Sequence, residues 1–162
     1  MGKYGDYIEI ANNNLIFDGV NCVDLAQKYG TPLFVISENT LRKNFRTFHD
    51  AFQSRYPAEV LTTVGLKSNY GLAMRKVLAT EPGAGGEAFG LGELYSALVS
   101  GIHPRKIVMN GCSKSTEILR AAIDAGITID LDCLEEIYRT EAVAKELNKK
   151  AYVNVRCRLP LA

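Results

Sequence analysis

Several features are missing from this chain of 162 residues, and each absence excludes a class of protein. No apolar stretch approaches the roughly 20 residues of a membrane-spanning helix, so we expect no membrane partner. The first ten residues, MGKYGDYIEI, lack the apolar core of a signal peptide. The formal net charge is only +1 and gives no electrostatic reason to expect nucleic acid as a partner. We therefore expect a cytoplasmic protein.

Patterns that bind metals are missing as well. The four cysteines include no CxxC pair, and both histidines lie far from every cysteine in the sequence. A zinc site usually needs clustered thiolate and imidazole ligands. We therefore expect no metal site and four reduced thiols, with Cys112 and Cys157 as buried small hydrophobic residues rather than nucleophiles.

What the chain does contain, after about residue 58, is a regular alternation of strands and helices. Apolar or β-branched segments predict five strands, at residues 60–67, 85–90, 106–111, 128–132 and 151–158. Segments with helical spacing separate them, which implies parallel pairing through right-handed crossovers. Ser115 is an expected helix N-cap, and Asp132 with Glu135 resembles a capping box.

The segment before these strands differs in kind. It contains an expected hairpin with its turn at Asn12–Asn14, a short helix and a strand, at residues 7–17, 22–29 and 31–36. Ser37 is an expected cap for the helix that follows. We therefore assign residues 1–36 to a β-rich segment of a second domain and residues 37–162 to an α/β unit.

The size of the chain limits the architecture. A complete (β/α)8 barrel needs about 250 residues, whereas this chain supplies about four βα units and a fifth strand. A doubly wound sheet could close at this length, so the periodicity alone leaves both folds open. In a barrel, Val60, Leu61, Val64 and Leu66 would face an interior that a missing half should fill.

Lys67 is the first candidate for chemistry, because it ends the first strongly apolar segment. Sites in α/β folds gather at the carboxyl ends of strands. A lysine with partial burial and cationic neighbours can attack a carbonyl carbon. A solvated lysine in a strand-to-helix loop is the alternative, and for a lone lysine it is the more frequent case.

Five segments in order resemble the fold-type III pyridoxal-phosphate decarboxylases, the family of diaminopimelate and ornithine decarboxylases with a barrel like that of alanine racemase. LKSNYGLAMRKVL, with Lys67-Ser68-Asn69, resembles the cofactor-lysine motif. GGEAFGLGELYSAL, KIVMNGCSKS, YGTPLFVISENTLRKNF and VNVRCR resemble other blocks of the family, and the likeness extends from about residue 23 to 158. The chain departs from the pattern at Val64, where the decarboxylases usually have an aromatic residue, and at Gly90, where they often have serine.

The resemblance implies a fold and a site. The fold is the N-terminal half of a TIM barrel, with about four βα units plus a fifth strand, preceded by a short β-rich element. The cofactor is pyridoxal 5'-phosphate, held covalently by Lys67. By the same resemblance Glu87 and Glu93 position the lysine, and Arg156 lies near the cofactor's 3-oxygen.

The resemblance also implies an activity. The leading expectation is decarboxylation of a diamino or basic amino acid by a homo-oligomeric enzyme whose C-terminal half is missing from this chain, so that these 162 residues are inactive alone. An amino-acid racemase of the same fold would instead use Lys67 as a base. A non-catalytic cofactor-binding or regulatory relative is the third alternative.

Overall fold

The computed structural model describes residues 7–69 and 71–157. The chain divides into two compact units, Met1–Asp50 and Ala51–Ala162. The first unit holds a small antiparallel sheet and the second a parallel sheet with helices.

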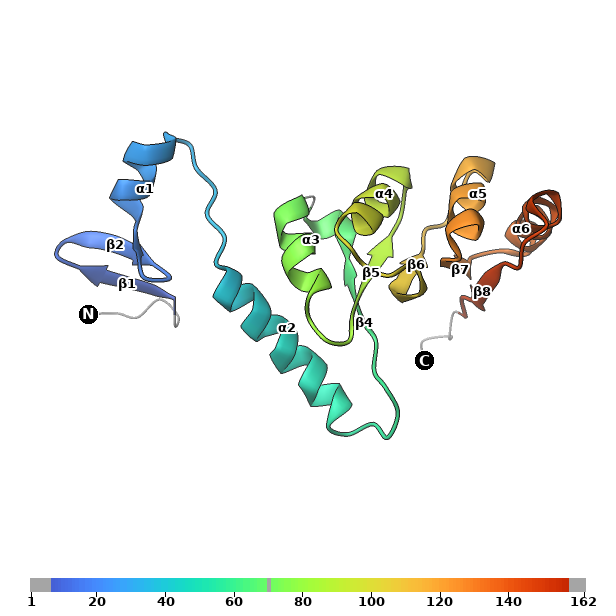
Figure 1. The fold of residues 1–162 in the computed structure, drawn as a ribbon, viewed down its shortest axis with the longest axis horizontal. Coiled ribbons are helices and arrows are strands. Elements are labelled where there is room, and N and C mark those ends of the chain that lie inside the picture. Colours follow the sequence, from blue (N-terminus) through green and yellow to red (C-terminus); the bar gives the residue numbers. More distant parts are fainter. Residues whose placement is uncertain (1–6, 70, 158–162) are drawn as a thin grey trace, which may run out of the picture. The chain divides into compact units, whose positions relative to one another are not determined.

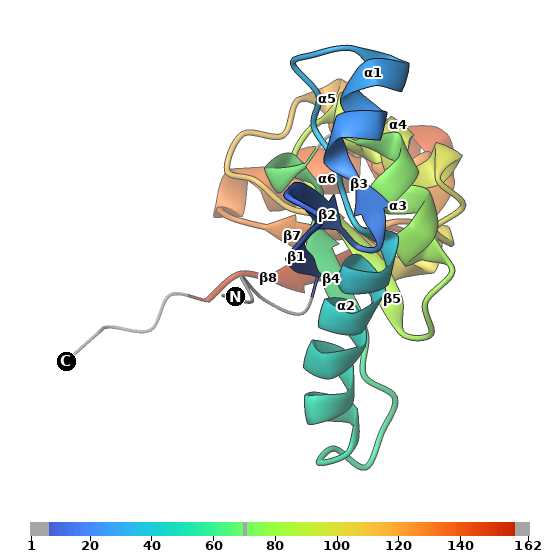
Figure 2. The same cartoon turned by 90° about the vertical axis from the view of Figure 1, so that its left-hand side faces the viewer.

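The first unit is built on a hairpin. Its strands, in the order β1-β2-β3, are Ile8–Ala11, Asn14–Phe17 and Val20–Asn21. Asn12 and Asn13 turn the chain between β1 and β2 with positive φ angles of 50° and 61°, which asparagine tolerates better than most residues. Helix α1 (Cys22–Tyr29) lies beside β2 and β3 (Figures 1 and 2). The predicted hairpin and short helix are confirmed.

Residues 31–36 do not form the predicted strand. They are exposed and carry no strand assignment, and no pairing of this segment is found in the described part of the chain. An apolar, β-branched segment becomes a strand only when a neighbour accepts its backbone hydrogen bonds. Ser37 does cap the next helix, α2 (Glu38–Gln53), because its Oγ accepts a hydrogen bond from the Thr40 backbone N–H at 3.0 Å.

The second unit contains the five predicted strands, paired in parallel and in chain order (Figure 1). The strands β4 to β8 are Thr62–Gly65, Ala84–Ala88, Ile107–Met109, Thr128–Leu131 and Tyr152–Val155. The helices α3 to α6 are Leu72–Ala79, Leu91–Val99, Thr116–Ala125 and Leu134–Leu147. Two short 3-10 turns, η1 (Leu66–Ser68) and η2 (Pro104–Lys106), follow β4 and precede β6. A βα repeat with every strand beside its predecessor is the predicted arrangement.

The hydrophobic core lies between the sheet and the helices. Alternate strand residues enter it, since successive side chains of a strand point to opposite faces. Its fully buried members include Ile107, Met109, Ile129, Leu119 and Ala97. Burial of the isoleucine, leucine and methionine side chains among them contributes roughly 1.5–3 kcal/mol each.

Leu66 corrects one expectation about the faces of the sheet. It is 3% exposed and belongs to this core, rather than facing a barrel interior. A Cβ at Gly86, which is in register with Val64, would touch the side chains of Leu66 and Ile102. Val64 therefore also lies on the helix side of the sheet. Treating every apolar residue near β4 as an interior residue ignored the two-residue period of a strand.

Of the two caps predicted for α5 and α6, the first is confirmed and the second is shifted by one residue. Ser115 caps α5, since its Oγ accepts from the Ile118 N–H at 3.3 Å. The box expected at Asp132 and Glu135 is displaced by one residue, because Cys133 is the N-cap of α6 and Glu136 reaches back to the Asp132 N–H at 2.9 Å. The Asp132 side chain instead forms an ion pair with Arg156, which follows β8.

Candidate functional site

The carboxyl edge of the parallel sheet carries the candidate site. Lys67 lies in η1, just beyond the end of β4 rather than on the strand itself. Its side chain is exposed, and its Nζ lies 4.6 Å from the centre of the Phe89 ring, which follows β5. A lysine amine over an aromatic face is an electrostatically favourable arrangement.

Arg75 of α3 fixes the turn that carries this lysine. The guanidinium is buried and donates to the carbonyl oxygens of Leu66 and Asn69, at 2.8 and 3.1 Å. These two carbonyls lie on either side of Lys67 in the sequence. The backbone of the turn is therefore held while the Lys67 side chain stays accessible.

Glu87 lies on the open face of β5, the face opposite the helices. Its Oε1 accepts a hydrogen bond from Asn110 Nδ2 at 2.6 Å. A Cβ at Gly65 would lie 3.6 Å from Oε2, so this carboxylate also lies against the end of β4. The structure thus brings Glu87 next to the turn of Lys67, although sequence reasoning missed Asn110. A polar residue directly after an apolar strand was the available signal.

Glu93 contacts the segment that leads into α4. It is 7% exposed in the first turn of α4, and its Oε2 accepts from the Phe89 backbone N–H at 2.5 Å. This contact is a helix-capping interaction in which the carboxylate also benefits from the positive end of the helix dipole. Glu93 therefore reaches Lys67 through Phe89, whose ring contacts the lysine amine.

Arg156 follows β8 and pairs with Asp132, which follows β7. Arg156 NH1 lies 3.3 Å from Asp132 Oδ1, and the two side chains are 61% and 16% exposed. The arginine is therefore open to solvent in the described part of the chain. The sequence predicts Asp132 as part of a helix cap and does not indicate its pairing with the next strand end.

A second charged pair, Lys114 and Glu136, was not predicted at all. Both side chains are buried, at 1% and 0% exposure, and Lys114 Nζ lies 3.0 Å from Glu136 Oε2. The ammonium also donates to the carbonyl oxygen of Gly111, and the carboxylate accepts from the Asp132 N–H. No sequence signal identifies such a lysine, because lysine is almost never fully buried unless it is paired.

The environment of Glu136 sets its ionisation. Burial alone would raise the pKa of this carboxyl. The hydrogen bonds from Asp132 and Lys114, together with the Lys114 charge, outweigh burial and hold the pKa below its ordinary value. Glu136 thus stays ionised and ties the loop after β6 to the start of α6.

That loop approaches the lysine through Gly111. Gly111 has a φ of 103°, a conformation that favours glycine. A Cβ there would lie 3.6 Å from the Phe89 carbonyl oxygen and 3.7 Å from its ring. The buried pair therefore holds a loop that packs against the aromatic ring beside Lys67.

A hollow of about 500 Å³ lies between α3 and the start of α4. It is lined by Arg75, Phe89, Gly90, Gly92, Glu93 and Ser96. Gly90 and Gly92 leave open space where side chains would stand. The described residues contain no convergent group of three histidine, cysteine or acidic side chains for a metal ion. No helix among them is long and apolar enough to cross a membrane.

The cysteines differ from the prediction. Cys112 and Cys157 are exposed rather than buried, as is Cys133, while Cys22 is partly buried. All four are free thiols. The prediction was wrong because Cys112 and Cys157 lie just past the ends of their strands, where the side chains leave the packed layer.

Comparisons with known proteins agree with this arrangement. A family model described as "Pyridoxal-dependent decarboxylase, pyridoxal binding domain" matches residues 38–160. The diaminopimelate decarboxylase of Methanothermobacter thermautotrophicus is 35% identical over 133 residues, which are 82% of this chain and 31% of that protein. The enzyme of Methanocaldococcus jannaschii is 34% identical over 155 residues, 93% of this chain and 35% of that protein.

Solved structures give the same picture. The crystal structure of the M. jannaschii diaminopimelate decarboxylase matches with a TM-score of 0.88 at 33% identity, over 93% of this chain and 35% of that chain. A structure from Aquifex aeolicus matches with a TM-score of 0.86 at 32% identity, over 94% of this chain and 36% of that chain. The chain thus spans about a third of these relatives, and its parallel sheet corresponds to the N-terminal part of the decarboxylase barrel, as predicted. With a family model that matches most of its length, the chain belongs to the pyridoxal-dependent decarboxylases, in their pyridoxal-binding domain.

Proposed function

We propose that this chain supplies the cofactor-binding part of a pyridoxal-phosphate-dependent decarboxylase that acts on a diamino acid, with diaminopimelate as the substrate. The observation that carries the proposal is the convergence of an exposed lysine, an acid–amide pair and an acid–arginine pair on one edge of a parallel sheet. The relatives named diaminopimelate decarboxylase support the choice of substrate. L-Lysine, present in one related crystal structure, is the product expected after loss of one carboxyl group.

The residues at this edge suit the chemistry of pyridoxal phosphate. Its aldehyde needs an accessible amine, which Lys67 offers. Its aromatic ring needs an apolar or aromatic neighbour, which Phe89 offers, and its phenolic oxygen needs a cation, which Arg156 offers. When bound, the cofactor ring accepts the electron pair released as a bond to the substrate Cα breaks.

The chain's own residues then have distinct roles. Lys67 would hold the cofactor through its aldehyde group and would supply a proton near the substrate Cα. Arg156 would hold the phenolic oxygen, with its guanidinium oriented by Asp132. Glu87 would orient Asn110 next to the turn of Lys67, and Glu93 would hold the Phe89 backbone in place.

The proposal includes partners that complete the site. The remaining part of the barrel must cover the open face of the sheet and supply the groups that bind the phosphate and the pyridine nitrogen. A homo-oligomer in the cytoplasm is the assembly that we propose for the complete enzyme. Groups that act together lose far more than one order of magnitude in rate when several are absent, so we expect no decarboxylase activity from this chain alone.

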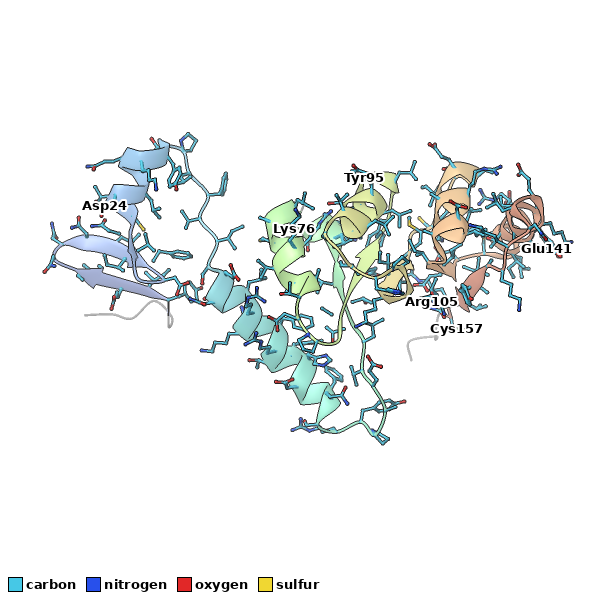
Figure 3. All side chains as sticks on the ribbon, in the orientation of Figure 1. Asp24, Lys76, Tyr95, Arg105, Glu141 and Cys157 are labelled. Atoms are coloured by element: carbon cyan, nitrogen blue, oxygen red, sulfur yellow. The ribbon has the colours of Figure 1, made fainter. Side chains whose placement is uncertain are left out.

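A chimera tests the function. This chain would replace the aligned N-terminal third of the M. jannaschii enzyme, and carbon dioxide release from diaminopimelate would be measured with pyridoxal phosphate present. We expect turnover by the chimera, loss of at least about two orders of magnitude in Lys67→Ala, and little change in Lys76→Ala, a matched change of an exposed lysine on α3 (Figure 3). Circular dichroism of all three proteins would establish that they fold alike.

Two outcomes would contradict the proposal. One is a folded Lys67→Ala chimera that keeps its activity. The other is turnover by the isolated chain at an ordinary enzymatic rate, about 1 per second or more.

A further inference from the structure

Two exposed cysteines follow adjacent strands at the carboxyl edge. Cys133 comes two residues after the end of β7, and Cys157 comes two residues after the end of β8. Neither belongs to the set of residues that the proposed function uses. Their positions follow from the pairing of the two strands.

The register of β7 and β8 sets these two cysteines opposite each other. Leu131 is in register with Val155, the last pair of the ladder. The pairing continues beyond it, because the Arg156 N–H donates to the Leu131 carbonyl at 3.0 Å and the Arg156 side chain meets Asp132 at 3.3 Å. The next pair in this register is Cys133 with Cys157.

The geometry of parallel strands suits a disulfide at this pair. Neighbouring strands lie about 4.7–4.9 Å apart, and residues two positions beyond a registered pair point to the same face as that pair. A disulfide needs Cα atoms about 4.4–6.8 Å apart with side chains on the same side. Cys133 itself has extended backbone angles, with φ −151° and ψ 164°, and the chain bends there into α6.

Both thiols are also available for reaction. Cys133 is the N-cap of α6, yet its side chain makes no capping hydrogen bond that would hold the sulfur in place. Cys157 Sγ has one weak contact, at 3.8 Å from the Val155 carbonyl oxygen. Neither contact opposes rotation of the two side chains about χ1.

Cys112 has no such partner. Met109 is in register with Ile129, so an extended continuation of β6 would bring Cys112 opposite Asp132 and not opposite Cys133. The chain also leaves the strand direction at Gly111, whose φ is 103°. The pairing of Cys133 is thus directed to β8 and not to β6.

We propose that Cys133 and Cys157 form a reversible disulfide across the carboxyl ends of β7 and β8. A disulfide oxidant of the glutathione class takes two electrons from the two thiols: one S–S bond forms in the chain, the oxidant's S–S bond breaks, and its two sulfurs leave as thiols with the two protons. The bond would flank the Asp132–Arg156 pair and fix the two strand ends that carry it. This pairing depends on the strand register and not on the proposed decarboxylase activity.

The test uses the purified chain at low micromolar concentration, where contacts between copies are rare. The chain is oxidised with oxidised glutathione, free thiols are alkylated, and the chain is digested with an endoproteinase that cleaves after lysine. Cys112, Cys133 and Cys157 then fall on separate peptides, at residues 107–114, 115–145 and 151–162. Mass spectrometry before and after reduction identifies the joined pair.

We expect the peptides 115–145 and 151–162 to be joined as the main product, and dithiothreitol to separate them. Cys112→Ser should leave this product unchanged, whereas Cys133→Ser and Cys157→Ser should abolish it. In concentrated urea the preference should disappear, because Cys112 lies closer to Cys133 in the sequence than Cys157 does and closes a shorter loop. Joining of Cys112 to Cys133 as the main native product, an unchanged preference in urea, or no intramolecular disulfide would overturn the proposal.

Discussion

At the carboxyl edge of the sheet, Lys114 and Glu136 form an ion pair removed from solvent, whereas Asp132 and Arg156 form a pair whose arginine is open to it. The first pair is at most 1% exposed and has hydrogen bonds to surrounding backbone groups. The second leaves the arginine 61% exposed. A buried pair with its hydrogen bonds made is an anchor, while an exposed cation at a strand end remains available to a ligand.

The comparison explains why proximity to the site does not by itself assign a role. Lys67 and Lys114 both lie at this edge and near Phe89. Lys67 contacts the Phe89 ring directly, whereas Lys114 donates to the carbonyl oxygen of Gly111, which packs against Phe89. Lys67 has an accessible amine, and Lys114 has an amine committed to Glu136 and Gly111. Only the first can meet a cofactor without breaking a buried ion pair.

The largest expected effect comes from removing one partner of the buried pair. Glu136→Gln leaves the Lys114 ammonium buried without a countercharge, which typically costs about 3–5 kcal/mol. The free energy of unfolding, from urea titration with an unchanged slope, measures it. Glu141→Gln is the matched control, because Glu141 lies on the same helix and pairs with Lys145 at an exposed site (Figure 3).

The control variant should lose only a few tenths of a kcal/mol. A double variant, Lys114→Met with Glu136→Gln, should recover much of the loss, because no unpaired charge is then buried. Equal losses in Glu136→Gln and Glu141→Gln would remove the distinction between the buried pair and an ordinary surface pair.

Acid should act on the buried pair next. The pKa of Glu136 is lowered from the ordinary value of 4.5 in the folded chain, so ionised Glu136 contributes stability above that value. The contribution is lost as the pH falls from about 4.5 through the lower folded pKa. The stability difference between the native chain and Glu136→Gln, measured by urea titration at several pH values, should be constant near neutral pH and shrink in this acidic range. A difference that grew on acidification would mean that the pKa is raised instead.

The smallest effect on stability is expected at the open pair. Arg156→Ala should change the free energy of unfolding by only about 0–1 kcal/mol, as for other exposed ion pairs. In the complete enzyme the same change should shift the pH at which the absorbance of the bound cofactor changes, because the phenolic oxygen loses its cation. Thermal melting of the cofactor-free form and an absorbance titration measure the two effects. A large loss of stability with an unchanged titration would reverse the roles that we assign to the two pairs.

The strands and the edge that carries the candidate site could be predicted from the sequence because they depend on local patterns. Apolar or β-branched segments predicted all five strands of the parallel sheet, and Lys67 is recognisable as a charged residue at the end of the first of them. Arg156 lies inside the last predicted strand and was a candidate only through the resemblance. The resemblance to the decarboxylases then supplied the chemistry that the pattern alone left open.

Other features depend on contacts between distant segments and could not be predicted in this way. Lys114 is buried because Glu136, from another βα unit, neutralises it. At the start of α6 the capping contact comes from Glu136 rather than Glu135, and the Asp132 carboxylate pairs with Arg156 across the strands. Both depend on strand register, which the periodicity of a single segment does not fix.

Covalent labelling tests the central claim, that Lys67 is the lysine available to the cofactor. The purified chain is incubated with a small excess of pyridoxal phosphate and reduced with borohydride, and the pyridoxyl mass is located by peptide mapping. We predict that the label lies mainly on Lys67, that Lys114 stays unlabelled until the chain is unfolded, and that Lys76 reacts only as a minor surface site. Preferential labelling of Lys76 or of Lys114 in the folded chain would contradict the account.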